Sequence, residues 1–272
     1  MWHTSEGEGR DIVFIHGWTM DHRDEMRTYE PIFALRSGWR RHYIDLPGMG
    51  RSPARSDIAS MDDMLAAVVD IIQLEVKDRR FVIAGTSAGG YLARGVLARL
   101  GGRIDGVLLR APLIVARDDL RDVDPVEPLL ADASVLEPIP SQERERLGDI
   151  LMQTAPYVAA LRAKVGSVVS PANAMADEPF LSKIRDAPER YAFSFDVDAV
   201  PAVPCPSLIV TGRHDSSVGY RDAWRLVDKF TRSTFVVLDR AEHGLPIDQQ
   251  DVFAALVNEW LDRIDEFQSF RQ

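Results

Sequence analysis

Apolar residues along the chain fall into short continuous runs that alternate with longer stretches of helical spacing. The runs are rich in β-branched residues, which is typical of parallel strands buried on both faces. The stretches between them repeat apolar residues three and four positions apart, as one face of a helix does. The predicted strands span residues 12–16, 41–45, 81–85, 104–109, 207–211 and 234–239. The predicted helices between them span residues 62–77, 88–100, 220–230 and 248–264.

Strand alternating with helix implies crossover connections, and therefore an α/β fold with a mostly parallel central β-sheet flanked by helices. The alternation stops over residues 113–199, where helical patterns cover 141–153, 155–165 and 179–187 without a convincing strand. We therefore expect a core domain made of residues 1–112 and 200–272, with residues 113–199 as a helical insertion. Such an insertion is either surface decoration or a lid that walls a substrate pocket. We expect the lid, because binding elements collect on connections held by a rigid scaffold.

Composition narrows the class of protein. The 272 residues are 46% hydrophobic, which is enough to bury a large core. The formal net charge of −10 argues against nucleic acid or an anionic membrane as a partner, since both favour clustered Lys and Arg. The opening stretch "MWHTSEGEGRD" shows no signal or transit pattern, and no apolar run reaches the roughly 18 residues of a membrane-spanning helix. We expect a cytoplasmic protein that is a monomer or a homodimer.

The most informative motif follows the third predicted strand. Gly85-Thr86-Ser87-Ala88-Gly89 matches the pattern Gly-x-Ser-x-Gly, between the buried run "FVIA" and a predicted helix. A sharp turn from strand into helix holds its serine in a strained conformation, and neighbouring glycines remove Cβ atoms that would collide. This geometry exposes the Ser87 hydroxyl at the carboxyl edge of the sheet, beside the free N–H groups of a helix N-terminus. The motif therefore predicts a nucleophile next to a site that favours negative charge.

A serine hydroxyl is a poor nucleophile near neutral pH unless a base lies close to it. His243 and Asp215 each come just after a predicted strand. Because parallel strands end at the same edge of a sheet, both can converge on Ser87. Asp239 and His214 lie nearby in the sequence, and we expect them to serve turns and loops. The residues thus predict a nucleophile, an orienting carboxylate and a general base in the order Ser, Asp, His.

Five stretches together resemble the α/β-hydrolase superfamily, over nearly the whole chain apart from the insertion. They are "FIHGW" at 14–18, "DLPGMGRS" at 45–52, "GTSAGG" at 85–90, "TGRHD" at 211–215 and "EHG" at 242–244. Their order and spacing are far more specific than any one of them. The resemblance implies the α/β-hydrolase fold, a helical cap over the site and a serine hydrolase.

By this resemblance Ser87 is the nucleophile, His243 the base and Asp215 the acid of a catalytic triad. The oxyanion hole would consist of the backbone N–H groups of Trp18 and Ala88. The supporting residues would be His16, Gly17, Gly85 and Gly89. The mechanism requires no metal and no organic cofactor. The single cysteine, which has no Cys or His partners for a zinc site, agrees with this expectation.

Two residues near the motifs need separate expectations. Glu242 stands where members of this family often have glycine, before the base His243. Its carboxylate either raises the affinity of His243 for a proton or points to solvent, and we expect the second. His22 lies in a charged loop after Trp18, where it either lines the pocket entrance or is a surface residue; we expect a surface residue. Apolar candidates for the pocket wall, most of which we expect in the core, are Trp18, Met20, Met152, Tyr157, Phe180, Tyr191, Phe193 and Phe195.

For the substrate, we expect a small molecule with a carboxylic ester or a lactone, cleaved through an acyl-enzyme. Hydrolysis of a carbon–carbon bond in a dienoic ketoacid is an alternative, and it calls for a cationic clamp such as Arg162 or Arg185. Action on small peptides as an aminopeptidase is another, calling for acidic residues around the amine. A non-catalytic ligand receptor that keeps the same three residues is the alternative from a different class.

Overall fold

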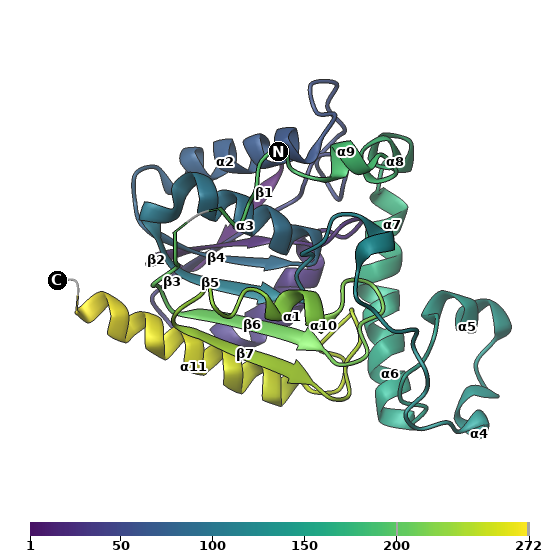
Figure 1. Cartoon of the computed structure of the whole chain (residues 1–272). Helices are drawn as coiled ribbons and strands as arrows, with labels where there is room; N and C mark the ends of the chain where they lie inside the picture. Colours follow the sequence, from purple (N-terminus) through teal and green to yellow (C-terminus); the bar gives the residue numbers. More distant parts are fainter. Residues whose placement is uncertain (200, 271–272) are drawn as a thin grey trace.

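The structure, a computed structural model, describes residues 1–199 and 201–270. The described residues form a seven-stranded sheet in the order β1-β3-β2-β4-β5-β6-β7 (Figure 1). Strand β1 is antiparallel to β3, and the other neighbouring pairs are parallel. The strands are β1 His3–Glu6, β2 Arg10–Ile15, β3 Trp39–Ile44, β4 Phe81–Thr86, β5 Ile104–Arg110, β6 Ser207–Gly212 and β7 Ser233–Leu238. This arrangement confirms the predicted α/β fold with a mostly parallel sheet.

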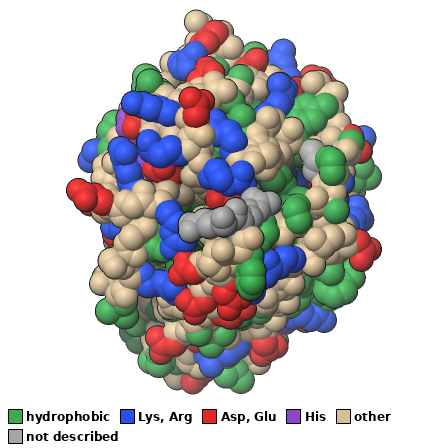
Figure 2. Space-filling model, turned by 90° about the vertical axis from the view of Figure 1, so that its left-hand side faces the viewer, with side chains coloured by type: hydrophobic (Ala, Val, Ile, Leu, Met, Phe, Trp, Pro, Cys, Tyr) green, Lys and Arg blue, Asp and Glu red, His purple; other side chains and the backbone are tan. Residues whose placement is uncertain are grey.

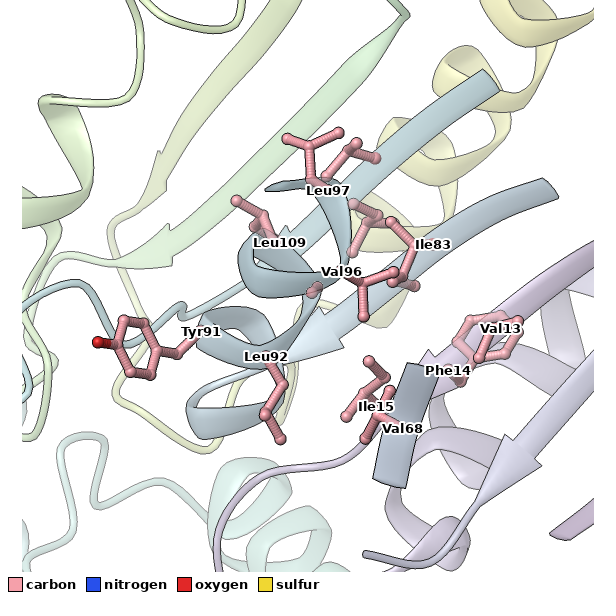
Figure 3. Close-up of a cluster of buried hydrophobic side chains, with 14 of the residues drawn as sticks. Val13, Phe14, Ile15, Val68, Ile83, Tyr91, Leu92, Val96, Leu97 and Leu109 are labelled. Atoms are coloured by element: carbon pink, nitrogen blue, oxygen red, sulfur yellow. The ribbon is translucent and has the colours of Figure 1, made fainter. Parts of the chain in front are cut away.

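Helices cover both faces of this sheet (Figure 1). Helices α2 (Met61–Val76) and α3 (Ala88–Leu100) lie on one face, and α1 (His22–Phe33) and α11 (Gln250–Ser269) lie on the other. Figure 3 shows part of the core beneath α3, where side chains of this helix meet those of α2 and of the strands. Fully buried members of this layer are Ile15, Val68, Ile83, Leu92, Val96 and Leu109. Burial of each such side chain is worth about 1.5–3 kcal/mol, so α3 is held firmly on the strands that it follows.

The insertion (residues 113–199) joins β5 to β6 and lies at the end of the sheet toward which β6 and β7 point (Figure 1). Within the described chain it contains helices and no named strand. They are the short 3₁₀ turn η2 Asp118–Leu120, α4 Ala133–Leu136, α5 Ser141–Leu147, α6 Ala155–Lys164, the π-helical segment η3 Val165–Val169, α7 Ser170–Met175, α8 Glu178–Arg185 and α9 Pro188–Tyr191. The insertion has a small hydrophobic cluster of its own, which Ile247 from the segment after β7 joins.

In the core, strand β1 and helix α1 are absent from the sequence-based prediction, as are the short helices α4, α7 and α9 of the insertion. Strand β1 reads "HTSE" and pairs only with β3 at the edge of the sheet, so it carries no apolar run. Helix α1 reads "HRDEMRTYEPIF", where charged residues and an internal proline obscure the helical pattern. Several of its charged side chains are nevertheless buried, because the core supplies ion-pair partners for them.

Two predicted helices end earlier than expected. Helix α5 stops at Leu147 because Gly148 adopts a left-handed conformation with φ of 69°. Helix α10 spans only Tyr220–Trp224 of the predicted 220–230, and the chain continues in turns.

The surface opposite the insertion carries charges of both signs. Figure 2, which faces the left-hand side of Figure 1, shows Lys and Arg side chains interspersed with Asp and Glu. Such mixing is typical of a solvated surface rather than of a basic groove for a polyanion. Within the described residues, no helix combines the length and the hydropathy needed to span a bilayer.

The turn from β4 into α3 is strained and tightly enclosed. Ser87 has φ of 54° and ψ of −121°, which side-chain-bearing residues seldom adopt. Gly89 lies so close to the end of β2 that a Cβ there would press on the carbonyl oxygens of Ile15 and His16. A Cβ on Gly85 would press on the backbone of Gly89 in the same way. Close approach of backbone to backbone therefore requires both glycines.

We expect Gly89→Ala to lower the free energy of unfolding by at least about 2 kcal/mol, because backbone atoms cannot move aside as a flexible side chain can. Gly102→Ala is the matched control, since Gly102 is exposed and a Cβ there has open space around it. This control should change the free energy by no more than about 0.5 kcal/mol. Urea unfolding followed by circular dichroism measures both, and equal small effects would contradict the close approach at Gly89.

Candidate active site

Three side chains meet at the carboxyl edge of the sheet, each from a loop that follows a different strand. Ser87 follows β4, Asp215 follows β6 and His243 follows β7. The Nε2 atom of His243 lies 2.9 Å from Oγ of Ser87, and its Nδ1 atom lies 2.9 Å from Oδ2 of Asp215. The imidazole therefore bridges the hydroxyl and the carboxylate, which is the juxtaposition that the sequence predicts.

The environment of Asp215 sets the proton positions in this cluster. Asp215 is buried, and its Oδ1 accepts the N–H groups of Ser217 at 2.8 Å and Val218 at 3.0 Å. Burial opposes ionisation, but His243 and these N–H groups outweigh it and hold the pKa of Asp215 below its ordinary value. An ionised carboxylate only accepts hydrogen bonds, so Nδ1 of His243 carries the proton. Nε2 is then free to accept the proton of the Ser87 hydroxyl.

The loop after β2 lies directly against the serine. A Cβ added to Gly17 would lie 3.3 Å from Cβ of Ser87, so the peptide that follows Gly17 is adjacent to the hydroxyl. Nε2 of the buried His16 accepts the N–H of Leu46 at 3.0 Å, and Nδ1 therefore donates to the Gly17 carbonyl at 2.7 Å. Burial lowers the pKa of His16, which keeps this ring neutral in its donor–acceptor role.

The hydrogen bond from His16 to the Gly17 carbonyl also orients the Trp18 N–H. The Gly17 carbonyl and the Trp18 N–H belong to one planar peptide, so fixing the first fixes the second. Ala88 is the first residue of α3, where N–H groups have no partner within the helix. In the described part of the chain, neither the Trp18 N–H nor the Ala88 N–H has a hydrogen-bond acceptor. Two unpaired donors beside Ser87 are what a developing oxyanion requires.

Glu242 does not point to solvent, and that expectation is wrong. Its Oε1 accepts the N–H of Leu151 at 3.0 Å and the hydroxyl of Tyr157 at 3.1 Å. Both donors belong to the insertion, which folds over the loop that carries the adjacent His243. Burial raises the pKa of Glu242 above its ordinary value. Periodicity of the insertion gave no sign of this docking, because it depends on tertiary packing.

His22 is also placed differently from the expectation. It is buried rather than on the surface, and its Nδ1 lies 2.9 Å from Oδ1 of Asp45. Its ring packs against Trp2, with centroids 4.3 Å apart. Asp239 is exposed, and His214 lies in the loop after β6, where its N–H donates to the Ala241 carbonyl at 3.0 Å.

Sequence reasoning missed a buried ionic network beneath the serine. Arg110, the last residue of β5, is wholly buried and forms ion pairs with Asp24 at 2.6 Å and Glu25 at 2.9 Å. Lys164, the last residue of α6, pairs with the other oxygen of Asp24 at 3.1 Å. One signal for it was available, since an arginine that closes the apolar run "GVLLR" needs a partner. Lys164 carried no such signal.

The candidate arginines of the insertion are engaged elsewhere. Arg162 forms two hydrogen bonds with the carboxylate of Glu143, and Arg185 pairs with Glu178 and Asp186. All three acidic partners lie within the insertion, and both arginine side chains are substantially exposed. Neither arginine is therefore an unpaired clamp for a substrate carboxylate.

The apolar candidates divide between core and insertion. Met152 and Tyr157 are buried in the cluster of the insertion itself. Trp18 meets Tyr191 edge-on, with ring centroids 5.2 Å apart, which links the loop after β2 to the insertion. Phe193 stacks on Tyr91 at 4.2 Å and thereby covers α3.

One group of potential metal ligands occurs among the described residues, formed by Asp21, His22 and Asp45. Its atoms already bond to one another and to neighbours: Asp45 accepts from His22 and from the Arg51 N–H, and Asp21 pairs with Arg23. Because the atoms of this group already have these hydrogen-bond and ion-pair partners, we interpret it as a structural network.

The chain matches the model of the alpha/beta hydrolase family over residues 12–256. It is 26% identical to a pimeloyl-[acyl-carrier protein] methyl ester esterase of Shewanella woodyi, over 95% of this chain and 96% of that protein. It is 28% identical to the esterase of the same name from Aliivibrio fischeri, over 96% of this chain and 97% of that protein. Among solved structures, an alpha/beta superfamily hydrolase from Oenococcus oeni is similar, with a TM-score of 0.84 and 27% identity over 97% of this chain and 96% of that one.

The match of the family model extends from β2 into α11 and so includes the strands and loops that carry Ser87, Asp215 and His243. The relatives named as esterases are aligned over nearly their full length. The chain therefore is a hydrolase that belongs to the alpha/beta hydrolase family.

Proposed function

We propose that this hydrolase cleaves a small carboxylic ester through an acyl-enzyme on Ser87. The observation that carries the proposal is the imidazole of His243, 2.9 Å from Ser87 Oγ on one side and 2.9 Å from Asp215 on the other. The relatives named as methyl ester esterases favour an ester over other acyl bonds. A lactone is a cyclic ester, so the same attack opens it.

In the first half of the proposed reaction, Ser87 Oγ forms a bond to the ester carbonyl carbon while His243 Nε2 takes the hydroxyl proton. The carbonyl π electrons move to oxygen, and the N–H groups of Trp18 and Ala88 hold this oxyanion. When the tetrahedral intermediate collapses, the bond to the alcohol oxygen breaks and His243 returns the proton to the leaving alcohol. Asp215 stabilises the imidazolium that exists between these two steps.

The second half repeats these steps with water. His243 takes a proton from water, the oxygen attacks the acyl carbon, and Ser87 leaves with the proton to release the carboxylic acid. One oxyanion donor of this kind is worth about 10²–10³ in rate, because the donor is already oriented before charge develops. The neutral His16, which fixes the Gly17 peptide, supplies that orientation on one side of the site.

The ester has more support than the alternatives. Cleavage of a dienoic ketoacid needs a cation for the carboxylate, and the two arginines considered for that role bond to acidic partners in the insertion. Among the described residues, no contact specifically favours an aminopeptidase. The His243 imidazole is within hydrogen-bond distance of both the Ser87 hydroxyl and the buried Asp215 carboxylate. A non-catalytic receptor would not need this arrangement.

We expect Ser87→Ala to lower kcat for p-nitrophenyl butyrate by at least about 10⁴-fold, because the covalent route is lost. Ser216→Ala is the matched control, since Ser216 is exposed beside Asp215 and is expected to keep wild-type turnover. Labelling with a fluorophosphonate should disappear only in the first variant. A Ser87→Ala enzyme that is folded and keeps turnover within tenfold of wild type refutes the nucleophile.

The lowered pKa of Asp215 predicts how the stability of the protein depends on pH. A carboxyl whose pKa is lower in the folded state stabilises the fold above the unfolded pKa, about 3.9, and the contribution is lost as pH falls through the folded pKa. Asp215→Asn lacks this contribution at every pH. The difference in free energy of unfolding between wild type and variant should therefore shrink from pH 7 to pH 3. Urea unfolding at several pH values measures it, and a constant difference would show that Asp215 is not stabilised in its charged form.

A further inference from the structure

The loop that carries His243 is held by the insertion on both sides of the histidine. Before it, the carboxylate of Glu242 accepts hydrogen bonds from the Leu151 N–H and the Tyr157 hydroxyl. After it, the ammonium of Lys164 donates to the Gly244 carbonyl at 2.7 Å. Ile247 adds an apolar contact, because it packs in the hydrophobic cluster of the insertion.

Lys164 occupies a site built around its charge. The side chain is 11% exposed, and its ammonium forms an ion pair with the buried carboxylate of Asp24 at 3.1 Å. Asp24 in turn pairs with Arg110, whose guanidinium donates to the Leu245 carbonyl at 2.8 Å and to the Thr86 hydroxyl at 2.9 Å. Two buried cations thus hold the carbonyls of the two residues that directly follow His243.

Packing alone does not explain a charged group here. Burying an ammonium costs several kcal/mol even when it is paired, and an apolar side chain of similar length would fill the same space without that cost. An apolar side chain cannot, however, donate to the Gly244 carbonyl. Lys164 therefore contributes two things that an apolar side chain cannot: the ion pair with Asp24 and the hydrogen bond that fixes the backbone beside the histidine.

The position of that backbone matters for the imidazole. The side chain of His243 is 31% exposed, so close packing does not fix it from all sides. The loop after β6 holds the start of this loop, because the His214 N–H donates to the Ala241 carbonyl. The Asp215 bond orients the ring, but Nε2 reaches Ser87 only if the backbone of residue 243 is in place. A displacement of about 1 Å between reacting groups can cost as much as 10²-fold in rate.

We propose that Lys164 and Glu242 are positioning residues, through which the docked insertion places His243 against Ser87. The proposal rests on the proposed function, since the histidine that they position is the general base. The insertion then does more than wall the pocket: its docking assembles the base. If it undocks, the Glu242 carboxylate and the Gly244 carbonyl lose these hydrogen-bond partners, while Arg110 and His214 still hold the carbonyls of Leu245 and Ala241.

Lys164→Met tests the proposal, because methionine keeps the apolar stem and removes the donor. With p-nitrophenyl butyrate as substrate, we expect kcat to fall about tenfold and KM to change less than twofold. Lys183→Met is the matched control, since Lys183 is an exposed lysine of α8 in the same insertion. The control should leave both constants unchanged.

A second measurement reports on the histidine without turnover. We expect the Nδ1 proton of His243, which is hydrogen-bonded to Asp215, to give a low-field proton NMR resonance outside the range of ordinary backbone amides. We expect it to shift or broaden in Lys164→Met and to stay in place in Lys183→Met. A merely structural ion pair between Lys164 and Asp24 would lower stability but leave both this resonance and kcat as in wild type.

The outcomes are separable. A folded Lys164→Met enzyme with wild-type kcat and an unchanged resonance overturns the proposal. If that variant fails to fold, Tyr157→Phe removes only the hydroxyl donor to Glu242, and the same two readouts decide. If the wild type hydrolyses no ester and resists the fluorophosphonate, the proposed function fails, while the resonance still shows whether the insertion positions His243.

Discussion

The site depends on one imidazole that lies within hydrogen-bond distance of two groups at once. His243 reaches both Ser87 and Asp215, and each of the three side chains comes from a loop after a different parallel strand. A parallel sheet brings such loops to one edge, and strands buried on both faces hold that edge still. The core of the molecule therefore contributes to the site chiefly by fixing where loops begin.

The strained turn from β4 into α3 likewise fixes the position of Ser87. Ser87 adopts a conformation with positive φ, and the packing of α3 on the strands stabilises it there. Gly85 and Gly89 permit the backbones to approach, and Gly17 completes the contact from the loop after β2. These contacts bring the serine hydroxyl and the two free N–H groups together, so the nucleophile and the candidate oxyanion hole depend on the turn after β4 and the loop after β2 together.

Features of the fold and the site that depend on local sequence patterns could be predicted, whereas features that depend on contacts between distant segments could not. The buried strands, the Gly-x-Ser-x-Gly turn and the residues after β6 and β7 follow local patterns, and the structure brings Ser87, Asp215 and His243 together as expected. Strand β1 and helix α1 were missed because their apolar patterns are weak.

The contacts between the insertion and the loop after β7 escaped prediction for a different reason. The partners of Glu242 and Lys164 are set by how the insertion docks on the loop after β7, and helical periodicity contains no information on docking. Buried charges are also hard to predict, because charged residues such as Asp24 and Lys164 are expected at the surface unless their ion-pair partners are known. The division into core and cap domains, the cytoplasmic location and the oligomeric state stay predictions.

Acid quenching within a single turnover tests the central claim most directly. The protein is mixed with a p-nitrophenyl ester, stopped in the burst phase, digested with a protease and analysed by peptide mass spectrometry. We expect the acyl group on the peptide that contains Ser87, at a level that decays as product forms. An acyl group on another side chain, or product formation without any adduct, would contradict an acyl-enzyme at this serine.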